Sequence, residues 1–342
     1  MRLLSLRPGE SPIFVETSEL GLRGRPGIHV GGLQTNRWGF NDREWTREKP
    51  DGADRLAIIG DSFVVAAVPR EQGLVAQLQQ RLDARDGLPG AGTIEVLNFG
   101  VAAAGPETYA SILAHEAADL GVDRVMVMVF VGNDIAQSHP DFKTRVFFGA
   151  PRELLRRPFR VGFSVDHFYS LRLFRAARRT LAERWAQGGE DGPGTFSKKA
   201  FLAIERQRLE ICRIDLTRAM ERSYARLAER LAAMAETAAR QEMAFTVILA
   251  PDEFQVEDAL AQAVMERFRL DPSEFALDQP QEILARSLEP HGIPSLDLLD
   301  VFRIRTAAGD SLYLPRDTHW NAAGNALAAE TVIDHMAADS RW

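Results

Sequence analysis

The sequence predicts an α/β fold built around a central parallel sheet. Short apolar runs bounded by charge or glycine recur along the chain, as expected for strands that are buried on both faces. Longer amphipathic stretches separate these runs, and strands that alternate with helices form βαβ units. At 342 residues the chain is long enough for one large α/β domain or two smaller ones.

The elements follow one another in a regular order. Residues 1–54 are rich in Gly, Pro and Arg and predict an arm of loops and short strands packed on the core, followed by one domain at 55–342. Arg- and Ala-rich runs predict a helical insertion or cap at about 140–240. Strands are predicted at 55–60, 93–98, 124–131, 244–250 and 293–297. Helices are predicted at 71–86, 106–120, 168–187, 200–241, 256–269, 279–291 and 322–337.

Composition limits the classes of partner and compartment. The formal net charge of −7 argues against a nucleic-acid partner, which needs a concentrated basic face. Basic residues do gather between Arg152 and Arg184, where we favour a solvated helical face over a contact surface for an anionic substrate or a membrane. The single Cys212 predicts a buried or half-buried structural thiol. Since neither a secretory signal nor an apolar run of membrane-spanning length is seen, we expect a cytoplasmic protein.

Two short motifs follow the first two predicted strands. In Gly60-Asp61-Ser62 the serine lies at the mouth of the sheet, where its hydroxyl is exposed and its N–H can face an oxyanion. The alternative is that Asp61 or Ser62 only caps the next helix. The small residues from Asn98 to Gly105 suit either a backbone donor to an oxyanion or plain helix–strand packing.

Two further motifs complete the set. Gly132-Asn133-Asp134 follows a buried strand, and its amide can donate to an oxyanion or form an ordinary turn. Asp317-Thr318-His319 precedes the last helix, where the carboxylate can orient the imidazole and leave its second nitrogen free to deprotonate a serine. Open α/β sheets place ligand sites at the carboxyl ends of their strands, which is where three of the four motifs lie.

In this order the four motifs resemble the blocks of the SGNH (GDSL-like) hydrolase superfamily, over about 55–140 and 244–338. The resemblance implies a flavodoxin-like three-layer α/β/α sandwich that hydrolyses esters through an acyl-enzyme. It further implies that Ser62 is the nucleophile, His319 the general base and Asp317 the acid of a catalytic triad.

The same resemblance implies an oxyanion hole made of the Ser62 N–H, the Ala103 N–H and the Asn133 amide, with Gly105 as the alternative to Ala103. Many members have glycine at the position of Ala103, where alanine is acceptable if its φ is negative. Many also place the acid three residues before the histidine, a position that Arg316 occupies in this chain. An Asp-x-His-Trp block is familiar from a branch that includes acyltransferases and polysaccharide esterases.

Other residues are candidates for substrate contact. Asp61 and Trp320 are the main ones, because they adjoin the nucleophile and the base. The segment 36–43 is similar to one that precedes the serine block in bacterial relatives. Its Trp38 or Arg43 could touch substrate, although an ordinary structural arm is favoured. We expect no metal or organic cofactor, since the seven histidines are scattered without ligand spacing.

The sequence therefore predicts an esterase or deacetylase acting on an acylated carbohydrate or a small metabolite ester. An O-acyltransferase with the same triad is an alternative, because the two differ only in the nucleophile that attacks the acyl-enzyme. A non-catalytic binding protein on the same fold is a second alternative.

Overall fold

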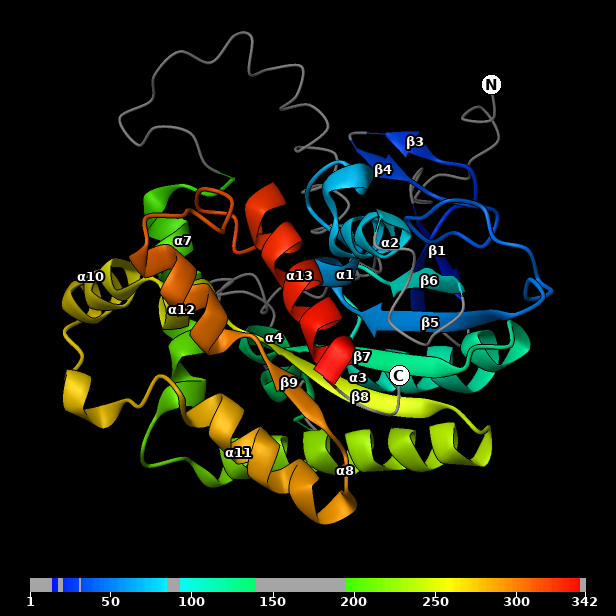
Figure 1. Cartoon of the computed structure of the whole chain (residues 1–342). Helices are drawn as coiled ribbons and strands as arrows, with labels where there is room; N and C mark the ends of the chain where they lie inside the picture. The colour runs from blue at the N-terminus through cyan, green and yellow to red at the C-terminus, as the bar shows by residue number, and fades with distance from the viewer. Residues whose placement is uncertain (1–13, 18–20, 31, 85–92, 140–194, 339–342) are drawn as a thin grey trace, which may run out of the picture.

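The centre of the molecule is a five-stranded sheet with the order β6-β5-β7-β8-β9, in which all neighbouring strands are parallel (Figure 1). Counted along the chain this is the order 2-1-3-4-5 of flavodoxin-like folds, so the predicted central parallel sheet is confirmed. The computed structural model describes residues 14–17, 21–30, 32–84, 93–139 and 195–338. The strands are β5 (Ala53–Gly60), β6 (Thr93–Gly100), β7 (Arg124–Phe130), β8 (Ala244–Ala250) and β9 (Ser295–Asp297).

Alternate side chains of each strand enter two separate cores. In β7, Val125 and Val127 pack into one core, whereas Met126 and Met128 pack into the other. This follows from the two-residue repeat of a strand, which sends successive side chains to opposite faces. Because helices cover both faces, the strand sequence is apolar throughout and does not alternate with polar residues.

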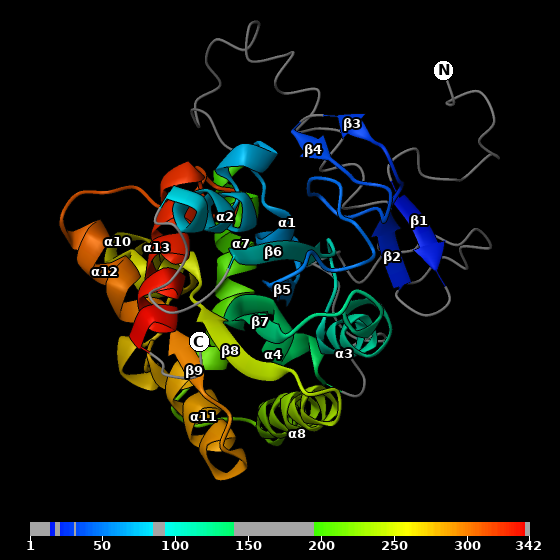
Figure 2. The same cartoon turned by 45° about the vertical axis from the view of Figure 1, so that its right-hand side comes forward.

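Helices form one layer on each face of the sheet, as Figures 1 and 2 show. The three-layer sandwich is therefore confirmed. One core lies under α1 (Ser62–Val65), α2 (Leu74–Ala84), α12 (Leu299–Ala307) and α13 (Ala322–Ala338). The other lies under α3 (Pro106–Ile112), α4 (Val131–Gln137), α8 (Arg218–Arg240), α10 (Asp258–Phe268) and α11 (Gln279–Leu288). Shorter elements are α9 (Glu253–Val256), the π-helical turn η3 (Leu113–Ala117) and the 3-10 helices η2 (Arg70–Gln72), η6 (Pro272–Glu274) and η7 (Glu289–His291).

The described part of the predicted insertion is helical but is not one continuous run. It consists of α7 (Lys198–Arg208), the 3-10 helix η5 (Leu209–Cys212) and then α8. The chain breaks before α8 because the Thr217 side chain accepts a hydrogen bond from the N–H of Met220 and starts a new helix there. The predicted helix at 168–187 and the basic cluster between Arg152 and Arg184 lie outside the described residues.

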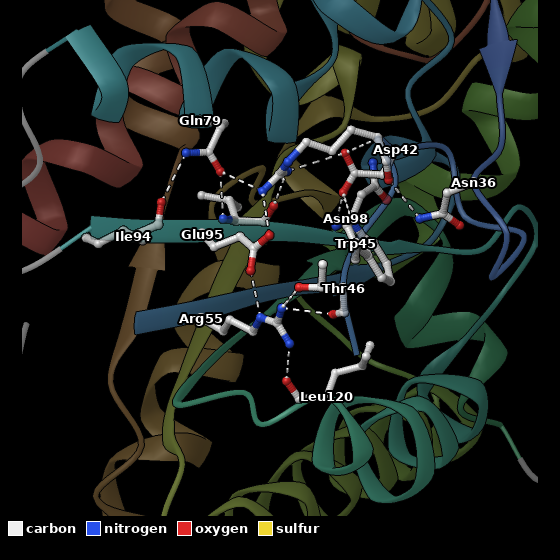
Figure 3. A network of polar contacts seen from close by, with 12 residues as sticks. Asn36, Asp42, Trp45, Thr46, Arg55, Gln79, Ile94, Glu95, Asn98 and Leu120 are labelled. Atoms are coloured by element: carbon white, nitrogen blue, oxygen red, sulfur yellow. Dashed lines mark hydrogen bonds and ion pairs between the residues drawn. The ribbon is translucent and has the colours of Figure 1, made fainter. Parts of the chain in front are cut away.

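The arm before β5 contains two small antiparallel pairs and packs on β6. Phe40 and Trp45 are buried against Phe99, with ring centroids 5.0 and 5.1 Å apart. Asp42 Oδ2 accepts hydrogen bonds from the Asn98 N–H and from Trp45 Nε1, each at 2.9 Å (Figure 3). These contacts hold the arm beside the strand that carries Asn98. The pairs are β1 (Phe14–Thr17) with β2 (Gly21–Gly24) and β3 (His29–Val30) with β4 (Leu33–Gln34).

The buried Arg55 joins the arm to the sheet near the amino-terminal ends of β5 and β6. The Arg55 side chain is fully buried and its Nε lies 2.7 Å from Glu95 Oε2 (Figure 3). Its remaining N–H groups donate to main-chain oxygens, among them those of Thr46 at 2.9 Å and Leu120 at 2.6 Å. Removing one member of such a buried ion pair lowers the free energy of unfolding by about 3–5 kcal/mol. Arg55 is therefore a structural residue.

None of the helices among the described residues combines the length and apolar character that crossing a bilayer requires.

Candidate functional site

The candidate site lies at the carboxyl ends of β5 and β7, the neighbouring strands between which the chain order reverses. Ligands of open α/β sheets bind at this switch point. Gly60 closes β5, and a Cβ there would lie 2.6 Å from Val64 Cγ2, so the tight turn into α1 requires glycine. Asp61 is the N-cap of α1, and its Oδ1 accepts a hydrogen bond of 2.9 Å from the Phe63 N–H. Ser62 is the first residue of that helix.

The structure brings together the three residues expected to form a triad. His319 Nε2 lies 2.8 Å from Ser62 Oγ, and His319 Nδ1 lies 2.7 Å from Asp317 Oδ1. A carboxylate only accepts hydrogen bonds, so Nδ1 carries the proton and Nε2 is free to accept one from the serine. This is the arrangement in which an imidazole acts as a general base.

The loop that carries the acid and the base has a strained backbone. Arg316 and Thr318 have φ of +48° and +74°, in the left-handed region that non-glycine residues rarely adopt. Such residues cost on the order of 1–3 kcal/mol each and persist where the surroundings hold them. The holding contacts are hydrogen bonds from Leu314 N–H to the His319 oxygen at 2.8 Å and from Phe196 N–H to the Arg316 oxygen at 3.1 Å. With this loop shape, an acid two residues before the histidine reaches the imidazole.

The second oxygen of the acid has its own partner. Thr195 Oγ1 donates a hydrogen bond to Asp317 Oδ2, and the Thr195 N–H donates to the Pro315 oxygen at 3.3 Å. Thr195 belongs to the predicted insertion, directly before α7. A segment distant in the sequence thus braces the acid, a contact that sequence reasoning missed.

The amide of Asn133 lies in the first turn of α4, so Gly132-Asn133-Asp134 is helical and the interpretation as a turn is wrong. Asp134 Oδ2 accepts a hydrogen bond of 3.0 Å from the Phe130 N–H, which makes the strand pass directly into the helix. Asn133 Oδ1 accepts a hydrogen bond of 3.1 Å from Arg208 Nη2. The Asn133 side chain also interacts with the Asp61 carboxyl, beside Ser62.

The loop after β6 differs from expectation at Ala103. Its φ is +63°, so the condition under which alanine was acceptable there, a negative φ, is not met. The position is thus one that glycine would fill without strain. Gly105 is extended, with φ of −140°, and is the N-cap of α3. Asn98 ties the loop to α1, because its Nδ2 donates to the Val64 oxygen at 3.0 Å and its Oδ1 accepts from the Gly100 N–H at 2.8 Å.

Two predicted substrate contacts are wrong in this structure. Trp320 is 1% exposed, with its ring packed between Phe63 and Phe302 at centroid distances of 5.0 Å each, so it belongs to the core. Asp61 is also 1% exposed, and its carboxylate caps α1. Neither side chain offers surface to a substrate.

The arm residues considered for substrate contact are structural as well. Arg43 Nη1 donates to the Val96 oxygen at 2.9 Å, and Nη2 pairs with Glu95 at 3.2 Å, in the middle of β6 and away from its carboxyl end. Trp38 packs against the larger core. The interpretation as a structural arm, which the sequence favours, agrees with these contacts. Cys212 is fully buried as expected, and burial raises the pKa of its thiol well above the ordinary value.

Sequence reasoning also missed a buried cluster of charged groups beside Asn133. Arg208 Nη1 lies 3.5 Å from Glu205 Oε1 and 3.5 Å from Asp252 Oδ2, and both carboxyl groups are fully buried. A Cβ on Gly132 would overlap the Asp252 carboxylate, which explains the glycine of that motif. One signal was present in the sequence: Asp252 comes two residues after the end of β8, at the carboxyl edge where the other motifs lie.

Burial shifts the carboxyl groups around the site toward the neutral form. It raises the pKa of Asp61, against the opposing effects of the Phe63 N–H and of the Asn133 amide. It also raises the pKa of Glu205 well above the ordinary value, with repulsion from Asp252 adding to the shift. Burial raises the pKa of Glu253 to about 9, and the charges of nearby carboxylates contribute. Such environments are frequent at functional sites.

The C-terminal part of the chain matches a known family. Residues 214–341 match the family model described as "SGNH hydrolase-like domain, acetyltransferase AlgX". The match includes Asp317 and His319, and Ser62 lies before it. No curated protein matches the chain.

Solved structures give distant alignments. An alpha/beta hydrolase enzyme from the metagenome of Lake Arreo aligns with 15% identity over 84% of this chain and 97% of its own, at a TM-score of 0.45. A lipase/acylhydrolase from Enterococcus faecalis aligns with 12% identity over 83% and 95%, at 0.43. An acetyl xylan esterase aligns with 10% identity over 82% and 98%, at 0.44. The fold assignment rests on the sheet topology. With that topology and the order of the motifs, the match of residues 214–341 to an SGNH hydrolase-like domain agrees with the superfamily that the sequence resembles.

Proposed function

We propose that the protein is a serine-dependent acyl esterase with Ser62 as nucleophile, His319 as general base and Asp317 as the orienting acid. The observation that carries the proposal is the continuous hydrogen-bonded chain Ser62–His319–Asp317 at the switch point of the sheet. The proposed substrate class is the ester of a short acyl group on a carbohydrate or a small metabolite.

In the first step Ser62 Oγ attacks the ester carbonyl carbon while His319 Nε2 takes the hydroxyl proton. The carbonyl oxygen becomes an oxyanion, and the tetrahedral intermediate collapses by breaking the bond to the alcohol. His319 returns the proton to that alcohol as it leaves, so the products are a free alcohol and an ester of Ser62. Water, deprotonated by His319, then attacks this acyl-enzyme. Collapse of the second tetrahedral intermediate releases the carboxylic acid, and His319 returns the proton to Ser62 Oγ.

The proposed oxyanion donors are the Ser62 N–H, the Ala103 N–H and the Asn133 amide. Preorganised donors of this kind stabilise the negative charge that develops in the transition state, and each is worth on the order of 10²–10³ in kcat. The Ser62 N–H is the first of α1, so the intrahelical hydrogen bonds leave it free to serve this role.

O-acyl transfer is a second candidate function. Its support is the family model that matches 214–341, whose description names an acetyltransferase. The acyl-enzyme would be the same, and a sugar hydroxyl would replace water in the second step.

A fluorophosphonate probe tests the shared step. It should label Ser62 of the wild type, as located by peptide mass spectrometry, and should leave Ser62→Ala unlabelled. The Ser273→Ala variant changes an exposed hydroxyl that bonds Asp271 and should be labelled like the wild type. If the wild type is not labelled, the proposal is wrong, and the alternative of a non-catalytic binding protein on this fold is favoured. Turnover of p-nitrophenyl acetate with and without a sugar acceptor then separates hydrolysis from transfer, because only transfer yields an acetylated sugar.

A further inference from the structure

We propose that Arg208, supplied by the helical insertion, is a positioning residue that orients the Asn133 amide for the oxyanion. The proposal rests on the proposed function, and it assigns part of the insertion to the working site. Its basis is the hydrogen bond of 3.1 Å from Arg208 Nη2 to Asn133 Oδ1, which joins the last residue of α7 to the first turn of α4.

The chemistry of the two groups fixes which way the amide faces. A primary amide has an oxygen that accepts and a nitrogen that donates, and the two orientations fill nearly the same volume. A guanidinium has only donors, so it is compatible with the oxygen and not with the NH2. Arg208 therefore holds Oδ1 on its own side. The NH2 is thereby turned away from the guanidinium, toward the side on which Asp61 and the adjoining Ser62 lie, where it can donate to an oxyanion.

The guanidinium is itself held in place. It lies within 3.5 Å of carboxylate oxygens of Glu205 and Asp252 and 5.0 Å from the centre of the Phe130 ring. The Arg208 side chain is 9% exposed and both carboxyl groups are fully buried. A buried arginine with this many partners has one position, and the amide that it bonds is correspondingly fixed.

A double-mutant cycle tests whether Arg208 acts through Asn133. Asn133→Ala should lower kcat for p-nitrophenyl acetate by about 10²–10³-fold. Arg208→Met should lower kcat by about 10–100-fold with KM changed less than about threefold. The reason is that a misoriented amide no longer stabilises the oxyanion of the transition state, whereas it contributes little to binding of the substrate. When Asn133 is already alanine, Arg208→Met should cost less than about threefold more. Arg206→Met, on the same helix with a half-buried partner, Glu210, is the matched control and should retain kcat.

The outcomes separate the two proposals. An equal loss from Arg208→Met in both backgrounds, or no loss in either, would overturn the positioning role while leaving the esterase intact. A wild type that neither turns over ester nor reacts with fluorophosphonate would overturn the esterase and the positioning role together. Circular dichroism and thermal unfolding establish that each variant is folded. If Arg208→Met does not fold, Arg208→Gln, whose amide offers both a donor and an acceptor and therefore does not fix the Asn133 orientation, takes its place in the cycle with the same pattern expected.

Discussion

Asp317 Oδ1 lies 2.7 Å from Nδ1 of His319 with a single residue, Thr318, between them in the chain. The left-handed backbone at Arg316 and Thr318 turns the two side chains toward each other. Thr318 is 2% exposed, so the surrounding structure holds its conformation. The geometry of the Asp317–His319 pair is therefore a property of this short loop, and Thr195 adds a contact to the carboxylate from outside it.

Replacing Asp317 should impair the action of His319 as a general base. Asp317→Asn should lower kcat by about 10²–10⁴, because an amide NH2 facing Nδ1 favours the wrong tautomer of the imidazole. Steady-state turnover of p-nitrophenyl acetate measures the effect. The control is Asp310→Asn, an exposed carboxylate paired with Arg305, which should keep kcat within about twofold. Unchanged turnover in Asp317→Asn would exclude Asp317 as the acid.

The hydrogen bond from Thr195 to Asp317 should increase kcat without being essential for turnover. Thr195→Val removes the hydroxyl that donates to Asp317 Oδ2 and should lower kcat by about 3–10-fold, which lies in the range of about 0.5–1.5 kcal/mol for the net contribution of one hydrogen bond. Thr195→Ser keeps the donor and should retain most of the activity. If the valine and serine variants lose the same activity, the hydroxyl has no part in the effect.

The backbone strain at Ala103 should affect the free energy of unfolding. Ala103→Gly removes a left-handed alanine that costs about 1–2 kcal/mol, against about 0.4–1 kcal/mol of added unfolded-state entropy. The free energy of unfolding in urea should stay the same or rise by up to about 1 kcal/mol, and kcat should be retained because the N–H remains. Ala102→Gly, at the buried neighbouring position, should instead lower stability by about 1 kcal/mol. Equal destabilisation by both changes would contradict the assigned φ.

The buried carboxyl of Glu253 should make stability depend on pH. With a folded-state pKa of about 9 against an ordinary 4.5, the folded state keeps a proton between these values that the unfolded state releases. Its contribution to stability is therefore greatest below the ordinary pKa and falls as pH rises toward about 9, by at most about 1.4 kcal/mol per unit. Glu253→Gln removes this titration.

The comparison is made by thermal unfolding between about pH 5 and about pH 8. The Tm of Glu253→Gln relative to wild type should rise across this range, whereas Glu282→Gln, an exposed carboxylate, should give a constant difference. A difference that does not change with pH in Glu253→Gln would show that Glu253 is ionised in the folded state throughout.

Most of the sheet could be predicted from the sequence, because buried parallel strands are continuous apolar runs. The strand at 244–250 is found with the predicted bounds, and those near 55 and 93 differ by two residues at one end. The helix α12 (Leu299–Ala307) was not predicted. Its buried residues are Leu299 and Phe302, and two apolar contacts in nine residues leave too weak a repeat to identify.

The site residues could be predicted where they belong to short motifs of reactive residue types. Ser62, Asp317 and His319 stand in motifs whose order is informative, and they meet as expected. Arg208 and Thr195 belong to no motif, and their partners are more than 70 residues away, at separations of 75 and 122. Trp320 shows the opposite error: a residue adjoining the base was assigned to the substrate, whereas its ring is needed to fill the core.

The order of the parts along the chain has a consequence for synthesis. The serine emerges from the ribosome 257 residues before the imidazole that activates it. At about 5–20 residues per second, a growing chain carries an unactivated hydroxyl for roughly 10–50 s. In the proposed mechanism, reactivity therefore appears only when the last loop docks, and a nascent or prematurely ended chain would be inactive.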